Sequence, residues 1–326
     1  MPLPLSISTR WNASRHADGA AMIREILELG ADAVELGYDL RLELLPGVQE
    51  MLRDHAVTVR SVHNFCPMPV GCLRATPELY TPGAPDPAER AAAVKHITKT
   101  LRFAAEVGAS VVVCHSGNVD MPHHTYELLR LAAHGQQFSP EYERVKLRAQ
   151  IARDKRAPRQ IDALCESLKA LVPVVRETGV ALALENLPTW EALPTELEGE
   201  QLMRQFARDG IRLWWDIGHA QIRDNLGFIN SRRWLERLLP HIAGFHVHDV
   251  IPPGEDHQAP PIRERGGVDF PALRKAVTAP GKIRVLEPSP RVAPDALRAA
   301  VQYLSKVWPS PDEPPTTPDT PPKESP

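Results

Sequence analysis

Four side chains of the kinds that bind metal ions recur at near-regular intervals in this chain of 326 residues, each at the end of a short apolar run. They are Glu185 in VALALEN, Asp216 in IRLWWDIGHA, His246 in IAGFHVHD and Glu287 in KIRVLEP, and they are 31, 30 and 41 residues apart. Such an interval accommodates one strand and one helix, and side chains at equivalent places in successive βα units converge if the units close into a barrel. Two glutamates, an aspartate and a histidine that converge predict a divalent-metal site.

Short runs rich in Val, Ile and Leu alternate with helix-like stretches, as expected for strands that are covered on both faces. We predict strands at residues 4–9, 33–37, 58–65, 110–116, 180–186, 211–217, 242–249 and 282–287. Helices are predicted at residues 19–29, 46–55, 87–107, 160–178, 197–208, 230–239, 270–278 and 293–306. This alternation predicts an α/β fold, a (β/α)8 TIM barrel. A doubly wound open sheet is the alternative. It does not by itself explain why each of the last six predicted strands, from His63 in the third to Glu287 in the eighth, carries a candidate ligand at its end.

The predicted domain organisation is one barrel, residues 1–308, followed by a disordered Pro-rich tail, residues 309–326. The tail contains eight prolines and no aromatic or aliphatic residue, so it has no apolar surface to bury. A long insertion follows strand 4, and its part SPEYERVKLRAQIARDKRAPRQ is basic and helical in pattern. We weigh two interpretations of it equally: a lid over the barrel mouth, or a solvated surface helix.

Composition excludes several classes of protein. The formal net charge of −3 provides no global field that would attract nucleic acid. No run approaches the roughly 20 apolar residues of a membrane span, and the N-terminal apolar stretch is too short for a signal peptide. Four irregularly spaced cysteines without a CxxC pair indicate free thiols in a reducing compartment. The default expectation is a soluble cytoplasmic protein, and a homo-oligomer is compatible with it.

The metal interpretation depends on charge. Without a cation, Glu185, Asp216 and Glu287 would place three like charges in a confined barrel mouth, at a cost to stability. His246 and His248 face the same way on one strand, and we favour His246 as the ligand because it lies deeper. This oxygen-dominated set is best suited to one Mn²⁺ ion, with Mg²⁺, Co²⁺ or Zn²⁺ as alternatives, and no organic cofactor is expected.

Further histidines fall at or just past the predicted strand ends, namely His63, His115, His219 and His257. Each one alone is more often a satisfied core residue than a functional one, but their concentration at one edge of a barrel favours a site. We predict that they contact the substrate. They also leave room for more than one metal ion.

These motifs resemble those of the xylose isomerase-like TIM-barrel superfamily, which includes sugar phosphate isomerases and epimerases, D-tagatose 3-epimerase, hydroxypyruvate isomerase, inosose dehydratase and endonuclease IV. The resemblance spans about residues 4–306 and is carried by SVHNF, VVVCHSG, LALENLP, WWDIGHA, GFHVHDV, DHQAPPIRERGGVDF and VLEP. The DHQAPP segment departs from the family's usual Asp-His-Leu-Pro-Pro-Gly, and RERGG carries two additional arginines. The contacts of that loop therefore do not carry over.

In the epimerase branch, the resemblance implies one divalent metal on Glu185, Asp216, His246 and Glu287. It implies that Glu185 and Glu287 also act as the acid/base pair on opposite faces of the substrate. Glu191, six residues past Glu185, falls where that branch places a substrate-contacting glutamate, and His219 would contact a substrate oxygen.

The chemistry of these residues fits the sugar isomerase or epimerase that the resemblance implies. Proton abstraction next to a carbonyl requires a positioned base and stabilisation of the resulting enediolate, which a metal ion provides. A lyase or dehydratase on the same site is one alternative, because the first step is shared. A trinuclear zinc endonuclease is another, since His63 and His115 with Glu185, and His219 with His257, fit additional ions. The acidic charge balance argues against a duplex-binding enzyme, and the intact ligand set argues against a non-catalytic binding module.

Overall fold

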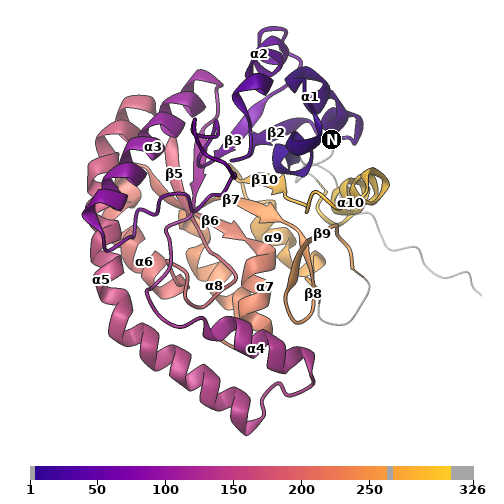
Figure 1. Ribbon diagram of the computed structural model, residues 1–326. Helices are drawn as coiled ribbons and strands as arrows, with labels where there is room; N and C mark the ends of the chain where they lie inside the picture. The colour runs from indigo at the N-terminus through magenta and orange to yellow at the C-terminus, as the bar shows by residue number, and fades with distance from the viewer. Residues whose placement is uncertain (1–3, 263–266, 310–326) are drawn as a thin grey trace, which may run out of the picture.

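Eight parallel strands close into a barrel in the computed structural model, which describes residues 4–262 and 267–309 (Figure 1). The strands are β1 (Ser6–Ser8), β2 (Ala33–Leu36), β3 (Val59–His63), β4 (Val111–Cys114), β5 (Ala181–Glu185), β6 (Ile211–Asp216), β7 (Ile242–Val247) and β10 (Ile283–Leu286). Each pairs with its neighbour in chain order, and β1 pairs with β10, where Ser6 lies opposite Val285. The predicted (β/α)8 barrel is therefore confirmed.

Ten α-helices surround the barrel in the described part of the chain. They are α1 (Gly19–Glu28), α2 (Leu45–Arg53), α3 (Pro87–Glu106), α4 (His124–Ala133), α5 (Pro140–Thr178), α6 (Glu196–Phe206), α7 (Ile217–Asn225), α8 (Ser231–Leu238), α9 (Arg274–Val277) and α10 (Pro294–Val307). Short 3-10 helices occupy Thr9–Trp11, Ala13–Arg15, Leu42–Leu44, Ala207–Asp209, Leu239–His241 and Pro271–Leu273. Polar N-caps explain several starts: Asp18 accepts two backbone N–H groups of α1, and Thr195 with Glu198 forms a capping box on α6.

The insertion after β4 contains two helices rather than the single helix and basic segment that the pattern predicts. Helix α5 runs without interruption for 39 residues, through Pro158 and Pro173, and α4 packs antiparallel along its first half as an arm (Figure 1). A small apolar cluster attaches this arm to the barrel: Tyr142 and Val145 of α5 pack with Ile222 of α7. The Tyr142 hydroxyl also donates to the Leu226 carbonyl at 2.9 Å. The sequence pattern predicts neither α4 nor α7.

A two-stranded antiparallel hairpin, β8 (Asp249–Ile251) and β9 (Glu255–Gln258), follows β7 where the sequence predicts a loop. Buried Asp249 organises it, because its carboxylate accepts the backbone N–H groups of Val250, Ile262 and Val268 at 2.8, 2.6 and 2.9 Å. The hairpin carries His257 over the C-terminal end of the barrel. His257 has a positive φ of 53°, a conformation that a non-glycine residue seldom adopts.

The core has two layers. Inside the barrel, Val113, Ala183, Trp214 and Val285 form a compact cluster, while the larger cluster lies between the strands and the helices. Trp214 and Trp215 at the end of β6 are both buried. Trp214 packs beneath His246, with ring centroids 5.1 Å apart.

The C-terminal end of the barrel domain, the cysteines and the hydropathy of the helices can each be compared with the expectations from the sequence. Trp308 is buried after α10, whereas residues 310–326 of the predicted tail lie outside the described residues. All four cysteines are free thiols, as predicted. Within the described residues, no helix combines the length and the apolar character that crossing a membrane requires.

Candidate metal centre and active site

The four predicted ligands meet at the C-terminal end of the barrel. Glu185 ends β5, Asp216 ends β6, His246 lies in β7, and Glu287 follows β10. Each offers one oxygen or nitrogen atom, and these four atoms lie within 4.8 Å of one another. His246 Nδ1 is 2.8 Å from Glu185 Oε1, 3.4 Å from Glu287 Oε2 and 3.7 Å from Asp216 Oδ2. All four side chains are buried.

Glu35, at the end of β2, forms the floor of the site. Its carboxylate lies 3.2 Å from His246 Nε2 and accepts a hydrogen bond from the Ser61 hydroxyl at 2.8 Å. Because Nε2 faces Glu35, the His246 ring directs Nδ1 toward the other three ligands. A carboxylate behind a ligating histidine is the usual way in which proteins orient the ring and raise its basicity. Glu35 lies within the predicted strand at residues 33–37, and its position alone did not indicate this role.

His63 and His115 flank Glu185 from β3 and from the residue that follows β4. Their Nε2 atoms lie 3.3 and 3.1 Å from Glu185 Oε2. On its other side, His115 Nδ1 lies 3.6 Å from Glu78. The structure therefore brings both predicted histidines to the Glu185 carboxylate, and His63, Glu185 and His246 form a second group with metal-binding spacing.

Asp216 is held by backbone as well as by side chains. It caps α7, because its carboxylate accepts the backbone N–H of His219 at 2.7 Å. His248 Nε2 lies 3.0 Å from the same carboxylate. His248 Nδ1 in turn accepts the backbone N–H of His257 at 2.9 Å. Both ring nitrogens of His248 therefore have partners, and the ring links Asp216 to the hairpin.

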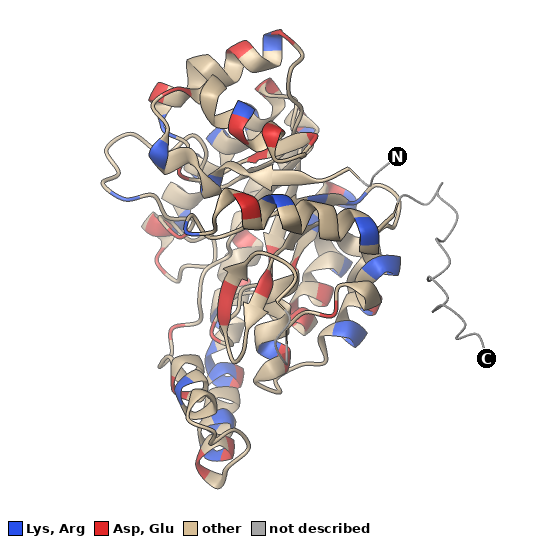
Figure 2. Cartoon of the chain, turned by 90° about the vertical axis from the view of Figure 1, so that its right-hand side faces the viewer, with Lys and Arg blue, Asp and Glu red and all other residues tan. Residues whose placement is uncertain are grey.

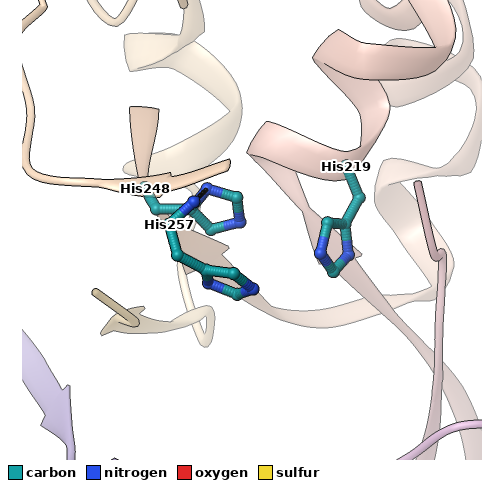
Figure 3. A group of neighbouring side chains, drawn as sticks. All are labelled: His219, His248 and His257. Carbon is teal, nitrogen blue, oxygen red and sulfur yellow. Dashed lines mark hydrogen bonds between the residues drawn. The ribbon is translucent and has the colours of Figure 1, made fainter. Parts of the chain in front are cut away.

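His219 and His257 approach each other across the mouth, from α7 and from the hairpin, with His248 beside His257 (Figure 3). His219 Nδ1 lies 3.0 Å from the Asn186 carbonyl, and His257 Nδ1 lies 2.9 Å from the Glu287 carbonyl. A carbonyl only accepts, so Nδ1 is the donor in both of these contacts. His257 Nε2 also lies 3.3 Å from Arg10 Nη1. The three histidines form another group with metal-binding spacing.

Burial and charge act in opposite directions on the ionisable groups of the site. Burial by itself raises the pKa of Glu185, but His246, His115 and His63 bring that pKa well below its usual value. Burial also disfavours charge on His246, yet Glu287, Glu185 and Glu35 raise its pKa well above the usual value. For His257, burial and then the charges of His248, Arg10 and His219 all lower the pKa. The cluster thus balances carboxylates against imidazoles, a donor set that a divalent cation fits.

A cavity of about 300 Å³ opens above the four ligands. Its lining includes six of the predicted site residues, namely His63, His115, Glu185, His219, His257 and Glu287. It also includes residues that no sequence pattern singled out, namely Arg10, Tyr38, Glu78, Asn118 and Tyr126. Tyr126 belongs to α4, so the arm contributes to the wall of the cavity.

Glu191 has a different environment from the other predicted site residues. It is fully buried, and its carboxylate accepts the Thr125 backbone N–H at 3.1 Å and the Thr125 hydroxyl at 2.6 Å. Thr125 lies in the first turn of α4, so this contact anchors the arm to the segment after β5. Glu191 is not among the residues that line the cavity.

Replacing Gly218 by alanine is expected to disturb the centre, because an added Cβ would overlap the His248 ring. Overpacking of this kind costs about 1–3 kcal/mol. Chemical denaturation should show this loss, together with weaker metal binding as Asp216 shifts. Gly199→Ala is the matched control, since its Cβ would meet Leu213 at an ordinary 3.4 Å within α6. Equal stability of the two variants would contradict the assignment of His248 as a support of Asp216.

The fold and the site define a (β/α)8 barrel whose mouth carries a buried cluster of carboxylates and histidines. The chain belongs to the xylose isomerase-like TIM barrel family, whose sequence profile it matches over residues 23–307. A search of curated proteins finds no matching sequence.

Several solved structures share the fold at low sequence identity. A D-tagatose 3-epimerase-like protein is 16% identical with a TM-score of 0.65, over 94% of this chain and 97% of the other. A 3-keto-D-glucoside 4-epimerase from E. coli is 16% identical with a TM-score of 0.63, over 93% and 98%. A putative xylose isomerase from Rhodospirillum rubrum is 15% identical with a TM-score of 0.66, over 94% and 100%.

Proposed function

We propose that this chain is a divalent-metal-dependent sugar isomerase or epimerase that removes and returns a proton next to a carbonyl group. One observation carries the proposal: Glu185 and Glu287, in a single cluster with Asp216 and His246, both face a cavity large enough for one sugar. The solved structures with the same fold include a D-tagatose 3-epimerase-like protein, a D-psicose 3-epimerase and an L-ribulose 3-epimerase, which is consistent with a carbohydrate substrate.

In this proposal, one of the two glutamates takes the proton from the substrate carbon and the other returns it. Glu185, Asp216, His246 and Glu287 would hold the metal ion, and Mn²⁺ is the best-suited ion for their oxygen-rich set. A bound divalent cation would stabilise the negative charge that develops on the substrate oxygens. His219 and His257 both line the cavity and would form hydrogen bonds with substrate hydroxyls.

Exchange of solvent deuterium tests this directly. The protein loaded with Mn²⁺ is expected to introduce deuterium at the carbon next to the carbonyl of at least one member of a panel of ketoses, inososes and keto-glycosides. Exchange establishes proton abstraction before the product is known, and mass analysis of the product then separates epimers from the dehydrated product of a lyase. A panel without any exchange, tested with fully metal-loaded protein, would refute the proposal.

An endonuclease with three zinc ions is the second candidate, because His63 and His115 both contact Glu185 and His219 lies close to His257. The charge distribution favours the sugar enzyme: acidic and basic residues are interspersed on the side of the molecule that Figure 2 shows. A duplex-binding face should be basic. Three zinc ions per chain, together with nicking of abasic DNA, would establish the endonuclease instead.

A further inference from the structure

A second cavity, of about 560 Å³, lies beside the one above the metal ligands. Its walls are the β9 strand with the residues that follow it and the segment from Ser289 to the first turn of α10. The two walls are joined, because the Ser289 backbone N–H donates to the His257 carbonyl at 2.8 Å. A preformed cavity of this size is within the range that takes small-molecule ligands.

The two cavities meet at Arg10 and His257, which line both of them. Arg10 Nη1 donates to His257 Nε2 at 3.3 Å and lies 3.7 Å from Glu287 Oε1. A molecule that contacts Glu287 in the first cavity therefore lies next to two side chains that also line the second cavity.

Among the residues that the structure describes, those that line the second cavity have mixed chemistry, and neither sign of charge dominates. Two arginines, Arg10 and Arg291, are matched by two acids, Glu255 and Asp256, with Gln258 and Ser289 as neutral polar groups. Apolar surface comes from Ala259, Ile262, Val292, Ala293 and Ala296. A phosphate group would require an excess of positive charge. Balanced polar groups beside apolar patches instead fit a neutral group that presents hydroxyls and an apolar face.

We propose that the second cavity is the subsite for the aglycone of a neutral keto-glycoside, whose oxidised sugar occupies the first cavity. This inference rests on the proposed function and narrows its substrate class from free ketoses and sugar phosphates to glycosides. Arg10 is then a specificity-determining residue, because it lies between the reacting sugar and the group attached to it.

Kinetics with 3-keto-D-glucosides that carry either a methyl or a phenyl aglycone tests the proposal. With both anomers and Mn²⁺-loaded protein, the phenyl compound of the accepted anomer is expected to show a kcat/KM for deuterium exchange about tenfold or more above that of the methyl compound, since a phenyl ring adds several contacts to a pocket. Ala296→Phe fills the second cavity from the exposed surface of α10 and is expected to bring this ratio to about one.

Ala299→Phe is the matched control, because Ala299 is exposed on the same helix but does not line the cavity. It should preserve the ratio. A ratio near one in the wild-type protein, or a ratio that Ala296→Phe leaves high, would overturn the proposal.

Binding of an unreactive glycoside separates a failure of this inference from a failure of the proposed function. Phenyl D-glucoside lacks the ketone and cannot react, so calorimetry reports binding alone. If no keto-sugar undergoes exchange, the proposed function fails, yet binding that Ala296→Phe weakens about tenfold and Ala299→Phe preserves would still support the subsite. Binding that is equal in both variants, or absent in the wild-type protein, would overturn the subsite.

Discussion

Glu185→Gln and Glu287→Gln are each expected to lower kcat by about 10³-fold or more, because each removes a proton-transferring group and a charged metal ligand together. Glutamine keeps the shape of the side chain but cannot accept the substrate proton. In Glu185→Gln, the histidines His63, His115 and His246 also lose the carboxylate that each of them contacts. The measurement is deuterium exchange and product formation at saturating Mn²⁺, on the best substrate from the panel.

Metal content and thermal unfolding must accompany these rates, so that lost catalysis is separated from a lost ion or a lost fold. Glu236→Gln is the control, since Glu236 is 72% exposed on α8, where it lies 3.8 Å from Arg232. It should retain wild-type activity. A Glu185→Gln or Glu287→Gln protein that keeps more than about a tenth of the wild-type rate would exclude that residue from proton transfer.

The barrel and its four candidate ligands could be predicted from the sequence, because both follow from local patterns. A strand that is buried on both faces shows as a short run of Val, Ile and Leu, and the C-terminal ends of parallel strands share one edge of the barrel. Glu185 and Asp216 end such runs, so their convergence required only that the barrel close. The structure brings these two residues and His246 together at the predicted edge.

The parts that the sequence did not predict depend on contacts between distant segments. Arg10 follows a strand of three residues, and nothing local distinguishes it from a solvated arginine; only the fold places it against His257, 247 positions away. The hairpin that carries His257 likewise depends on Asp249, whose carboxylate binds amides up to 19 residues away. The segment predicted as a loop is a hairpin in the structure, because the buried Asp249 carboxylate accepts hydrogen bonds from three of the backbone N–H groups in and after it.

Glu191 illustrates a different limit. The resemblance to sugar epimerases assigns it to the substrate, whereas its carboxylate is engaged by Thr125 at 2.6 Å in this structure. A motif position specifies the type of residue and its place in the chain, whereas the contact with Thr125 depends on where α4 packs in the fold. The role of Glu191 in substrate binding thus stays a prediction, and its contact with the arm is what the structure shows.

Removal of the metal ion is expected to abolish turnover and to lower stability. A ligand that binds only the folded state stabilises it by about 2.7 kcal/mol when its concentration is 100 times Kd. Thermal unfolding should therefore shift downward on chelation and return when Mn²⁺ is restored, together with activity. Activity that survives exhaustive chelation, confirmed by elemental analysis, would remove the metal from the mechanism.

Metal binding is further expected to release a proton, and the source is His246. Its carboxylate neighbours raise its pKa well above the usual value, so the ring is protonated in the metal-free protein near neutral pH, whereas a ligating imidazole must be neutral. The pKa values of Glu185 and Asp216 are lowered, so these groups are already ionised and release none. Affinity should therefore fall about tenfold for each unit of decreasing pH below the His246 pKa. Calorimetry in two buffers of different ionisation enthalpy counts the released protons, and a count that His246→Gln leaves unchanged would place the proton elsewhere.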